Sequence, residues 1–244
     1  MHRAVRKDEI LELLRRYNYV TVKFLADALY ISESSVRRDL AVMEAQGLIK
    51  RTHGGVSEIE SSNTLAPYTM RMQENSSAKR AICQRAAALI NDGDVLFIDG
   101  STTCLFLPEL IEQKQDITVL TNSLRLAALF KTDRVKVYCT GGSVRLQDEY
   151  VMAGPVAEDN VRRMHTNWMF FSARAMDENG VITDLNEPET SLRRVALEHT
   201  DKAVFLCDGS KFGVRSVFTV CDATDIYGII TDGDLPEAVR EKGI

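Results

Sequence analysis

Apolar residues recur at helical spacing three times near the start of the chain. The pattern predicts a first helix from about Lys7 to Tyr17, a short second helix after Thr21, and a third helix from Ser32 to about Gln46. Thr21 and Ser32 are predicted N-caps, because a side-chain oxygen at that position can accept a hydrogen bond from a backbone N–H of the first turn. Apolar residues flank both caps at the two positions of a hydrophobic staple, which supports both helix starts.

The third helix is expected to have one buried side and one exposed side. Val36, Leu40 and Met43 share one side at about 100° per residue. The residues that point away from this stripe are Ser34, Arg37, Arg38 and Ala41. Gly47 supplies a position at which the helix can end, and "LIKRTHGGV", residues 48–56, has the pattern of a compact hairpin. Three helices followed by a basic hairpin are the arrangement of a winged helix-turn-helix.

A polar segment separates this pattern from a longer alternation of helices and strands. Residues 58–77 read as a linker, so the predicted domains are residues 1–57, 58–77 and 78–244. Beyond the linker, apolar strand patterns such as "DVLFI", "ITVLT" and "VKVYC" alternate with helical patterns. This alternation predicts an α/β domain with a mostly parallel sheet covered by helices.

The charge of the chain is unevenly distributed. The formal net charge is −5, yet residues 1–56 contain ten Lys/Arg and seven Asp/Glu, or +3, so the remainder contributes −8. No apolar run approaches the roughly 18 residues of a membrane span, and the first residues lack the apolar core of a signal peptide. The chain is therefore expected in the cytoplasm and not in a membrane. Histidines and cysteines show no metal-ligand spacing, so no metal or other cofactor is expected.

The outward arginines of the third helix suit the recognition of DNA. A helix-turn-helix presents the start of its second helix to the major groove, where arginine can grip a guanine edge or neutralise a phosphate. The alternative is a solvated helix whose arginines pair with nearby acids, but the two caps and the basic hairpin favour DNA. The residues predicted to contact DNA are Thr21, Ser32, Ser34, Ser35, Arg37, Arg38, Lys50, Arg51 and His53.

Three loops of the second domain could bind an anion. Residues 99–103, "DGSTT", follow a strand and precede a helix, and they combine a glycine, three hydroxyls and the N–H groups of a helix start. "TGGS", residues 140–143, and "CDGSKFG", residues 207–213, also follow strands. Such loops line the ligand crevice of an open α/β sheet. The alternative for the first loop is an ordinary turn with a polar cap, and neither a Walker A loop nor GxGxxG occurs.

The run from Val20 to Val56 resembles the DNA-binding signature of the deoxyribose-operon repressor (DeoR) family of bacterial transcription regulators. The matching pieces are "LADAL", the cap Ser32, "RRDL" and the wing "RTHGG", and the similarity continues through nearly all of the chain. The resemblance implies a second domain similar in fold to ribose-5-phosphate isomerase that binds phosphorylated sugars. It also implies that residues 99–103 hold the phosphate, and Lys79 matches a lysine that the family places before the domain's first helix.

Together, the loops and the resemblance define a predicted effector site. Its residues are Lys79, Asp99, Gly100, Ser101, Thr102, Thr103, Gly141, Gly142, Asp208 and Lys211. The chain is accordingly interpreted as a transcriptional regulator and not an enzyme, most simply a repressor of a sugar-metabolism operon. A phosphorylated sugar is expected to release it from operator DNA, and paired half-sites require a homo-oligomer, either a dimer or a tetramer.

Two other functions fit parts of the sequence. The first is a sugar-phosphate isomerase with an auxiliary DNA-binding domain, which needs a carboxylate base. Asp177 and Glu178 are candidates, although "MDENGV" also has the pattern of a hairpin turn, and Asp184, Glu187 and Glu189 could instead be solvated loop acids. The second is an architectural DNA-binding protein without an effector.

Overall fold

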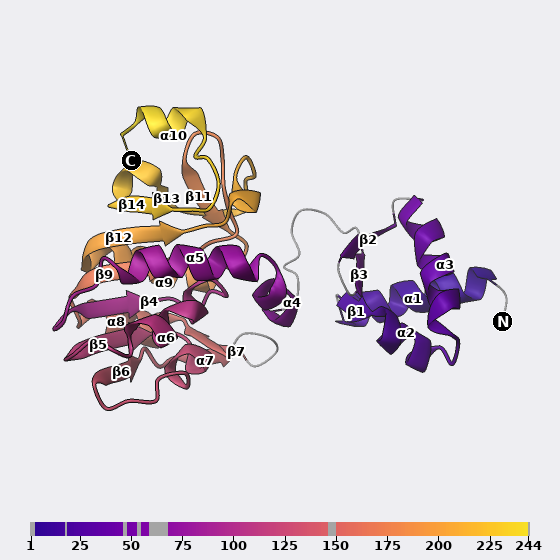
Figure 1. Ribbon diagram of the computed structural model, residues 1–244, viewed down its shortest axis with the longest axis horizontal. Helices are drawn as coiled ribbons and strands as arrows, with labels where there is room; N and C mark the ends of the chain where they lie inside the picture. Colours follow the sequence, from indigo (N-terminus) through magenta and orange to yellow (C-terminus); the bar gives the residue numbers. More distant parts are fainter. Residues whose placement is uncertain are drawn as a thin grey trace. The chain divides into compact units, whose positions relative to one another are not determined.

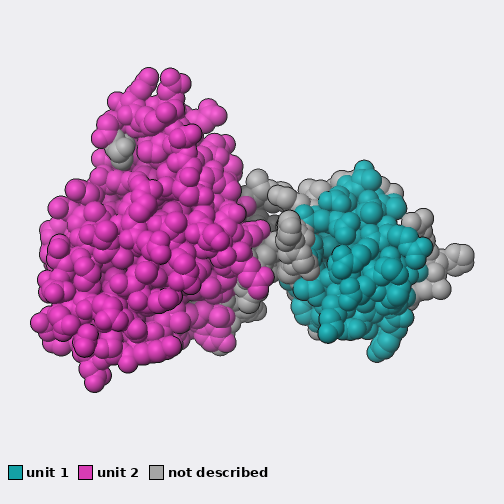
Figure 2. Space-filling view, viewed as in Figure 1, with its two compact units in different colours: residues 1–67 teal, residues 68–244 magenta. Residues whose placement is uncertain are grey.

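Three clusters of buried apolar side chains form the interior of the part of the protein that the structure describes. The computed structural model describes residues 3–17, 19–45, 48–52, 55–58, 68–145 and 150–243. The chain divides into two compact units, unit 1 (Met1–Pro67) and unit 2 (Tyr68–Ile244), shown in Figure 2. Each unit encloses its own buried apolar residues. Within the described ranges, no helix combines the length and the apolar character needed to cross a membrane.

The described residues of unit 1 form three helices and a three-stranded antiparallel sheet (Figure 1). The helices are α1 (Arg3–Tyr17), α2 (Val22–Ala28) and α3 (Glu33–Ala45), and the strands are β1 (Tyr19–Thr21), β2 (Ile49–Thr52) and β3 (Gly55–Glu58). The hairpin of β2 and β3 is the predicted wing, and β1 pairs with the other side of β3. The predicted winged helix-turn-helix is confirmed, with α1 beginning four residues earlier than expected.

Both predicted caps form at the helix starts of unit 1. Thr21 Oγ1 accepts a hydrogen bond from Phe24 N at 3.0 Å, and Ser32 Oγ accepts one from Ser35 N at 3.3 Å. Tyr30 adopts a left-handed φ of 54° in the turn between α2 and α3, and Ile31 N donates to the Ala26 carbonyl oxygen at 3.0 Å. This turn fixes the direction in which α3 leaves α2. The predicted helix end at Gly47 lies outside the described residues.

The predicted apolar stripe holds α3 against the rest of unit 1. Val36 and Leu40 are fully buried and Met43 is 2% exposed. They pack with buried residues of the other elements, namely Ile10, Leu14, Leu25, Ile49 and Val56. The opposite side of α3 is consequently held towards solvent.

A six-stranded sheet forms the centre of unit 2. Its order is β14-β12-β9-β4-β5-β6, and every neighbouring pair is parallel. The strands are β4 (Val95–Ile98), β5 (Ile117–Thr121), β6 (Val135–Cys139), β9 (Thr166–Phe171), β12 (Thr200–Leu206) and β14 (Gly228–Ile230). The predicted α/β class with a mostly parallel sheet is confirmed. Because all six strands run the same way, the loops after them share one edge of the sheet.

Helices cover both faces of this sheet (Figure 1). One face packs against α5 (Ser76–Ala87), α6 (Leu107–Ile111) and α7 (Leu124–Ala127), and the other packs against α8 (Pro155–Arg162) and α9 (Glu187–Glu198). The remaining elements are α4 (Tyr68–Gln73), α10 (Glu237–Glu241), the hairpin of β7 (Ser143–Arg145) and β8 (Val151–Ala153), and an antiparallel sheet of β10 (Ala175–Met176), β11 (Val181–Asp184) and β13 (Phe218–Asp222). Single 3-10 turns lie at Cys104–Phe106, Gly209–Lys211 and Ala223–Asp225.

The structure differs from the sequence prediction in the second half of the expected linker. Residues 68–73 form α4 and α5 begins at Ser76, so both belong to unit 2. The physical reason is tertiary. Tyr68 is 3% exposed within the apolar core, and the Arg125 guanidinium lies over its ring at 4.6 Å from the centroid. Neither contact can be read from the local polar pattern.

One buried ion cluster lies at the shared edge of the sheet. Arg193 in α9 donates from Nε to Asp99 Oδ2 at 2.8 Å and from Nη1 to Asp184 Oδ2 at 3.0 Å, and its Nη2 lies 3.5 Å from Glu189 Oε2. Burial alone would lower the pKa of Arg193, but the three carboxylates raise it overall, so the guanidinium stays charged. The cluster joins α9 to the ends of β4 and β11.

We expect Arg193→Met to destabilise unit 2 by about 3–5 kcal/mol, because it leaves buried carboxylates without their cation. Urea unfolding followed by the fluorescence of Trp168, the only tryptophan of the chain, measures this loss in unit 2. The matched control is Arg194→Met, which removes an exposed neighbour on the same helix and its hydrogen bond to the Thr219 carbonyl oxygen but leaves no carboxylate buried without its cation. Equal stability of the two variants would show that the cluster contributes nothing to folding.

Candidate nucleic-acid interface and effector site

The arginines of α3 lie on its exposed side. The Arg37 side chain is 59% exposed and its Nη2 lies 3.4 Å from Glu33 Oε2 one turn earlier. Arg38 is also exposed, and its Nε donates to the Ser34 carbonyl oxygen at 3.3 Å. Exposed pairs of this kind contribute only about 0.3–0.5 kcal/mol. Both guanidinium groups can therefore exchange these contacts for DNA.

The remaining residues of the predicted DNA-binding set have different surroundings. Ser32, Ser34 and Ser35 form a cluster in which the Ser32 hydroxyl lies 2.9 Å from that of Ser34 and 3.0 Å from that of Ser35. Thr21 caps α2, and Arg51 Nη1 lies 3.9 Å from Glu44 Oε2. Lys50 belongs to β2, but its side chain and the whole of His53 lie outside the described residues.

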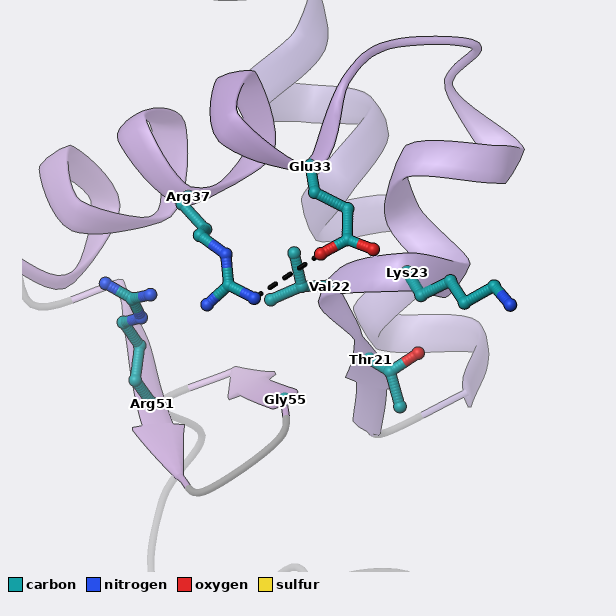
Figure 3. A pocket seen from close by; sticks show the side chains of 7 residues that line it. All are labelled: Thr21, Val22, Lys23, Glu33, Arg37, Arg51 and Gly55. Atoms are coloured by element: carbon teal, nitrogen blue, oxygen red, sulfur yellow. Dashed lines mark hydrogen bonds and ion pairs between the residues drawn. The ribbon is translucent and has the colours of Figure 1, made fainter.

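A hollow of about 200 Å³ opens between α3, the start of α2 and the wing. It is lined by Thr21, Val22, Lys23, Glu33, Arg37, Arg51 and Gly55. Figure 3 shows Arg37 and Arg51 extending from α3 and β2 towards the space between them, whereas Lys23 extends away from Arg37. The sequence reasoning missed Lys23 as part of this surface, and it considered Glu33 only as a possible ion-pair partner of the arginines. The only local signal of Lys23 and Glu33 was their position directly after a cap region.

In unit 2, the loop after β4 is shaped by Asp99. Its carboxylate is fully buried and accepts hydrogen bonds from Ser101 N at 3.1 Å and Ser172 N at 3.3 Å. Gly100 N donates to Asn122 Oδ1 at 2.9 Å, and a Cβ on Gly100 would lie 2.9 Å from Val151 Cγ2. A side chain at position 100 would thus force the neighbouring loop to move. Asp99 and Gly100 therefore hold the backbone of this loop in place.

Two cationic side chains lie at this edge of the sheet. Lys79 is only 3% exposed, and its Nζ donates to Thr102 Oγ1 at 3.2 Å and to the Arg71 carbonyl oxygen. Lys211 Nζ donates to Ser172 Oγ at 2.7 Å and to the Ala173 carbonyl oxygen at 2.9 Å. Lys79 lies within α5 and not ahead of it, in contrast to the position that the resemblance implied.

Asn75 connects the two lysine-bearing segments. It precedes α5 with a left-handed φ of 52°, and its Nδ2 donates to Asp208 Oδ1 at 2.9 Å, in the loop that also carries Lys211. Asp208 also accepts a hydrogen bond from Ser210 N at 3.3 Å. These contacts, with those of Ser172, close a ring from residues 99–102 through residues 172–173 and 208–211 to α5. We call this ring the sheet-edge site.

The electrostatics of the sheet-edge site are set by burial and by its lysines. Burial, and then the positive charge of Lys211, lower the pKa of Lys79 to about 8. Burial acts to raise the pKa of Asp208, but the hydrogen bond from Ser210 and the charge of Lys211 outweigh it and leave the pKa below its usual value. The site therefore combines two ammonium groups with a carboxylate that stays ionised.

Four predicted effector residues remain, Ser101 and Thr103 in the loop after β4 and Gly141 and Gly142 after β6. Ser101 is half-buried and its Oγ accepts a hydrogen bond from Cys104 N at 3.3 Å, whereas Thr103 is fully buried. Gly141 and Gly142 follow β6, and a Cβ on Gly142 would lie 2.7 Å from the Ala153 carbonyl oxygen. The structure places this glycine pair against β8 and α8. Neither glycine is among the residues to which Lys79 and Lys211 donate the hydrogen bonds described above.

The sequence reasoning missed three polar residues of this edge, Asn75, Ser172 and Arg193, as functional or supporting groups. Asn75 carried a signal, because asparagine before "SSAK" is a favoured N-cap residue. Arg193 lies on the inward stripe of α9 with Glu189, Leu192 and Ala196. Helical spacing could have placed Arg193 inside, but not its partners.

The acids considered as isomerase bases are largely engaged elsewhere. Asp177 Oδ1 accepts hydrogen bonds from Asn179 N at 3.0 Å and Val181 N at 2.9 Å, as expected for a hairpin turn. Asp184 and Glu189 contact Arg193, and Glu178 and Glu187 are exposed. Among the residues that the structure describes, no group of three or more His, Cys, Asp or Glu side chains could hold a metal ion.

Comparisons with known proteins identify both units. The family model of the DeoR-like helix-turn-helix domain matches residues 6–62, and that of the DeoR C terminal sensor domain matches residues 74–233. The chain is 33% identical to the L-fucose operon activator of Haemophilus influenzae, covering 97% of this chain and 94% of the relative. It is 29% identical to the HTH-type transcriptional repressor GlcR of Bacillus subtilis, covering 95% and 89%.

A solved structure of ribose 5-phosphate isomerase A from Methanocaldococcus jannaschii is a much weaker match. It has a TM-score of 0.42 and 18% identity, covering 57% of this chain and 55% of that one, which supports no conclusion. The relatives are named as regulators of transcription, so the enzyme alternative is not favoured. Since the two family models together cover most of the chain, it belongs to the DeoR family of DNA-binding transcriptional regulators.

Proposed function

We propose that this regulator represses a sugar-metabolism operon and that a phosphorylated sugar, bound at the sheet-edge site, releases it from operator DNA. The names of relatives include both an activator of a sugar operon and a repressor. Repression is the simpler direction, because a protein that occupies operator DNA blocks transcription without a further contact. Two copies of the chain would contact paired half-sites, so the active form is a homo-oligomer.

The observation that carries the proposal is the contrast between two buried cations at one edge of the sheet. Arg193 is surrounded by three carboxylates. Lys79, equally buried, donates its hydrogen bonds to two neutral oxygen atoms, and Lys211 lies near enough to lower its pKa. A phosphate beside Lys79 and Lys211 would compensate both charges. The hydroxyls of Thr102, Ser172 and Ser210 could donate to phosphate oxygens, and Asp208 could accept from a sugar hydroxyl.

Lys79 also suggests how binding could reach the DNA-binding unit. Its Nζ donates to the carbonyl oxygen of Arg71 in the last turn of α4, the helix with which unit 2 begins. The Arg125 guanidinium lies over the rings of both Tyr68 and Tyr150, at 4.6 and 4.7 Å, and so fastens the start of α4 to the body of unit 2. A phosphate that attracts Lys79 would weaken its bond to α4. We propose that the resulting shift of α4 alters the spacing of the DNA-binding units.

The main test measures DNA binding and effector binding separately. Fluorescence anisotropy with a duplex selected from a random pool gives operator affinity, and thermal unfolding gives effector binding. A sugar phosphate at about 100 times its Kd should stabilise the native state by about 2.7 kcal/mol, which raises the Tm of unit 2 by roughly 5–10 °C. The same compound should weaken operator binding, whereas the unphosphorylated sugar should do neither.

Two variants should separate operator binding from effector binding. Arg37→Ala with Arg38→Ala should abolish operator binding and keep the thermal shift, because both side chains are exposed and outside the core. Lys211→Ala should keep operator binding and lose the shift. Operator binding by the double variant at wild-type affinity would refute the role of α3. A panel of pentose and hexose phosphates without any effect on Tm would refute the effector.

Effector affinity should fall above pH 8. Lys79 has a pKa of about 8 without ligand, because burial and the charge of Lys211 outweigh the opposing charges of Asp208 and Glu74. A bound phosphate raises this pKa, so binding takes up a proton above pH 8 and weakens about tenfold between pH 7 and pH 9. Isothermal titration in two buffers of different ionisation enthalpy measures the proton uptake. Lys79→Met should bind weakly at every pH, and a wild-type profile flat to pH 9 would exclude Lys79 from the site.

Weakening the attachment of α4 to unit 2 should reduce the effect of effector binding on operator affinity. In Arg125→Met the effector should bind, but the ratio of operator Kd values with and without effector should fall about 2- to 30-fold relative to wild type. The control is Arg80→Met, which removes a comparable contact with Phe106, at 5.2 Å, that does not involve α4. An unchanged ratio in Arg125→Met would show that α4 does not transmit the signal.

A further inference from the structure

Arg37 and Arg38 are neighbours in sequence but face different surroundings. Arg37 lines the hollow beside the wing, with Arg51 extending into it from β2 (Figure 3). Arg38 is not among the lining residues, and its Nε is held by the carbonyl oxygen of Ser34 one turn earlier. The two side chains leave α3 about 100° apart, as expected for consecutive helical residues. They therefore meet different parts of a DNA duplex.

We infer that Arg37 and Arg51 together grip one phosphate of the DNA backbone, while Arg38 reads base edges. The inference rests on the proposed DNA-binding function. When α3 enters the major groove and the wing lies beside it, the sugar-phosphate strand that borders the groove passes between them. The hollow opens at this place, between α3 and β2. Both guanidinium groups carry the charge that attracts a phosphodiester, and arginine can bind phosphate oxygens through two hydrogen bonds.

Glu33 acts as the alternative partner of Arg37 in the same hollow. Its Oε2 lies 3.4 Å from Arg37 Nη2, and both side chains are about half exposed, at 49% and 59%. A phosphate competes with this carboxylate for the guanidinium, and the carboxylate repels the approaching backbone. Glu33 therefore lowers affinity for every duplex, and it does so regardless of sequence.

The test compares affinity for the selected duplex with affinity for a shuffled duplex of the same composition, from 50 to 300 mM salt. Each phosphate contact contributes about 0.9 to the slope of log K against log salt concentration. Arg37→Ala should reduce this slope by about 1 and weaken both duplexes by the same factor. Arg38→Ala should weaken the selected duplex by roughly 5- to 150-fold more than the shuffled one. Glu33→Gln should tighten both duplexes.

The pair of Arg37 and Arg51 gives the sharpest outcome. If they share one phosphate, Arg37→Ala together with Arg51→Ala should reduce the slope by about 1 in total, and neither single variant should reduce it by more, because only one phosphate loses its partners. A reduction of about 2 in the double variant would mean that the two arginines bind separate phosphates and would overturn the inference that they bind the same one. A loss in Arg37→Ala confined to the selected duplex would mean that Arg37 reads bases. Failure of the wild type to bind either duplex would instead refute the proposed function.

Discussion

A buried cation needs a compensating partner, and the edge of the unit 2 sheet contains two cations that meet this constraint differently. Arg193 is enclosed by Asp99, Asp184 and Glu189, so its charge is neutralised within the protein. Lys79 is as deeply buried and hydrogen-bonds to a hydroxyl and a backbone carbonyl, and the charges of Asp208 and Glu74 only partly offset its burial and the charge of Lys211. Dipoles compensate a charge less completely than an ion does. The first arrangement suits a role in the fold, and the second fits the anion site that we propose.

The DNA-binding face of α3 depends on the burial of its apolar side, which leaves the opposite side exposed. Val36, Leu40 and Met43 are packed so closely that α3 cannot rotate without exposing them, and the caps at Thr21 and Ser32 fix its start. The outward direction of each arginine is a consequence of this packing. The net charge of −5 does not oppose DNA binding, because exposed charges beyond a Debye length of about 8–10 Å are screened.

Where the local pattern of residue types determines an element, the sequence alone was sufficient to predict that element. "ITVLT" and "VKVYC" were predicted as strands at the bounds that β5 and β6 have, because short runs rich in β-branched and aromatic residues are typical of strands, although only Val135 of β6 is buried. Helix α4 was missed because Tyr68 and Arg125 are distant in sequence. Arg193 was missed because only the fold brings its three acids together. Lys23 was missed as part of a surface because the hollow requires the wing to fold back on α3.

The proposed binding of a sugar phosphate without its conversion agrees with where the carboxylates of unit 2 are used. Isomerisation requires a carboxylate base free to accept a proton beside the sugar. Asp177 accepts two backbone hydrogen bonds of its own turn, and Asp99, Asp184 and Glu189 share one guanidinium. At the sheet-edge site, Asp208 is held by Asn75 and Ser210. Because its pKa lies below the usual value, it is a weak base and a good hydrogen-bond acceptor. Such a carboxylate suits recognition of a sugar hydroxyl better than proton abstraction from carbon.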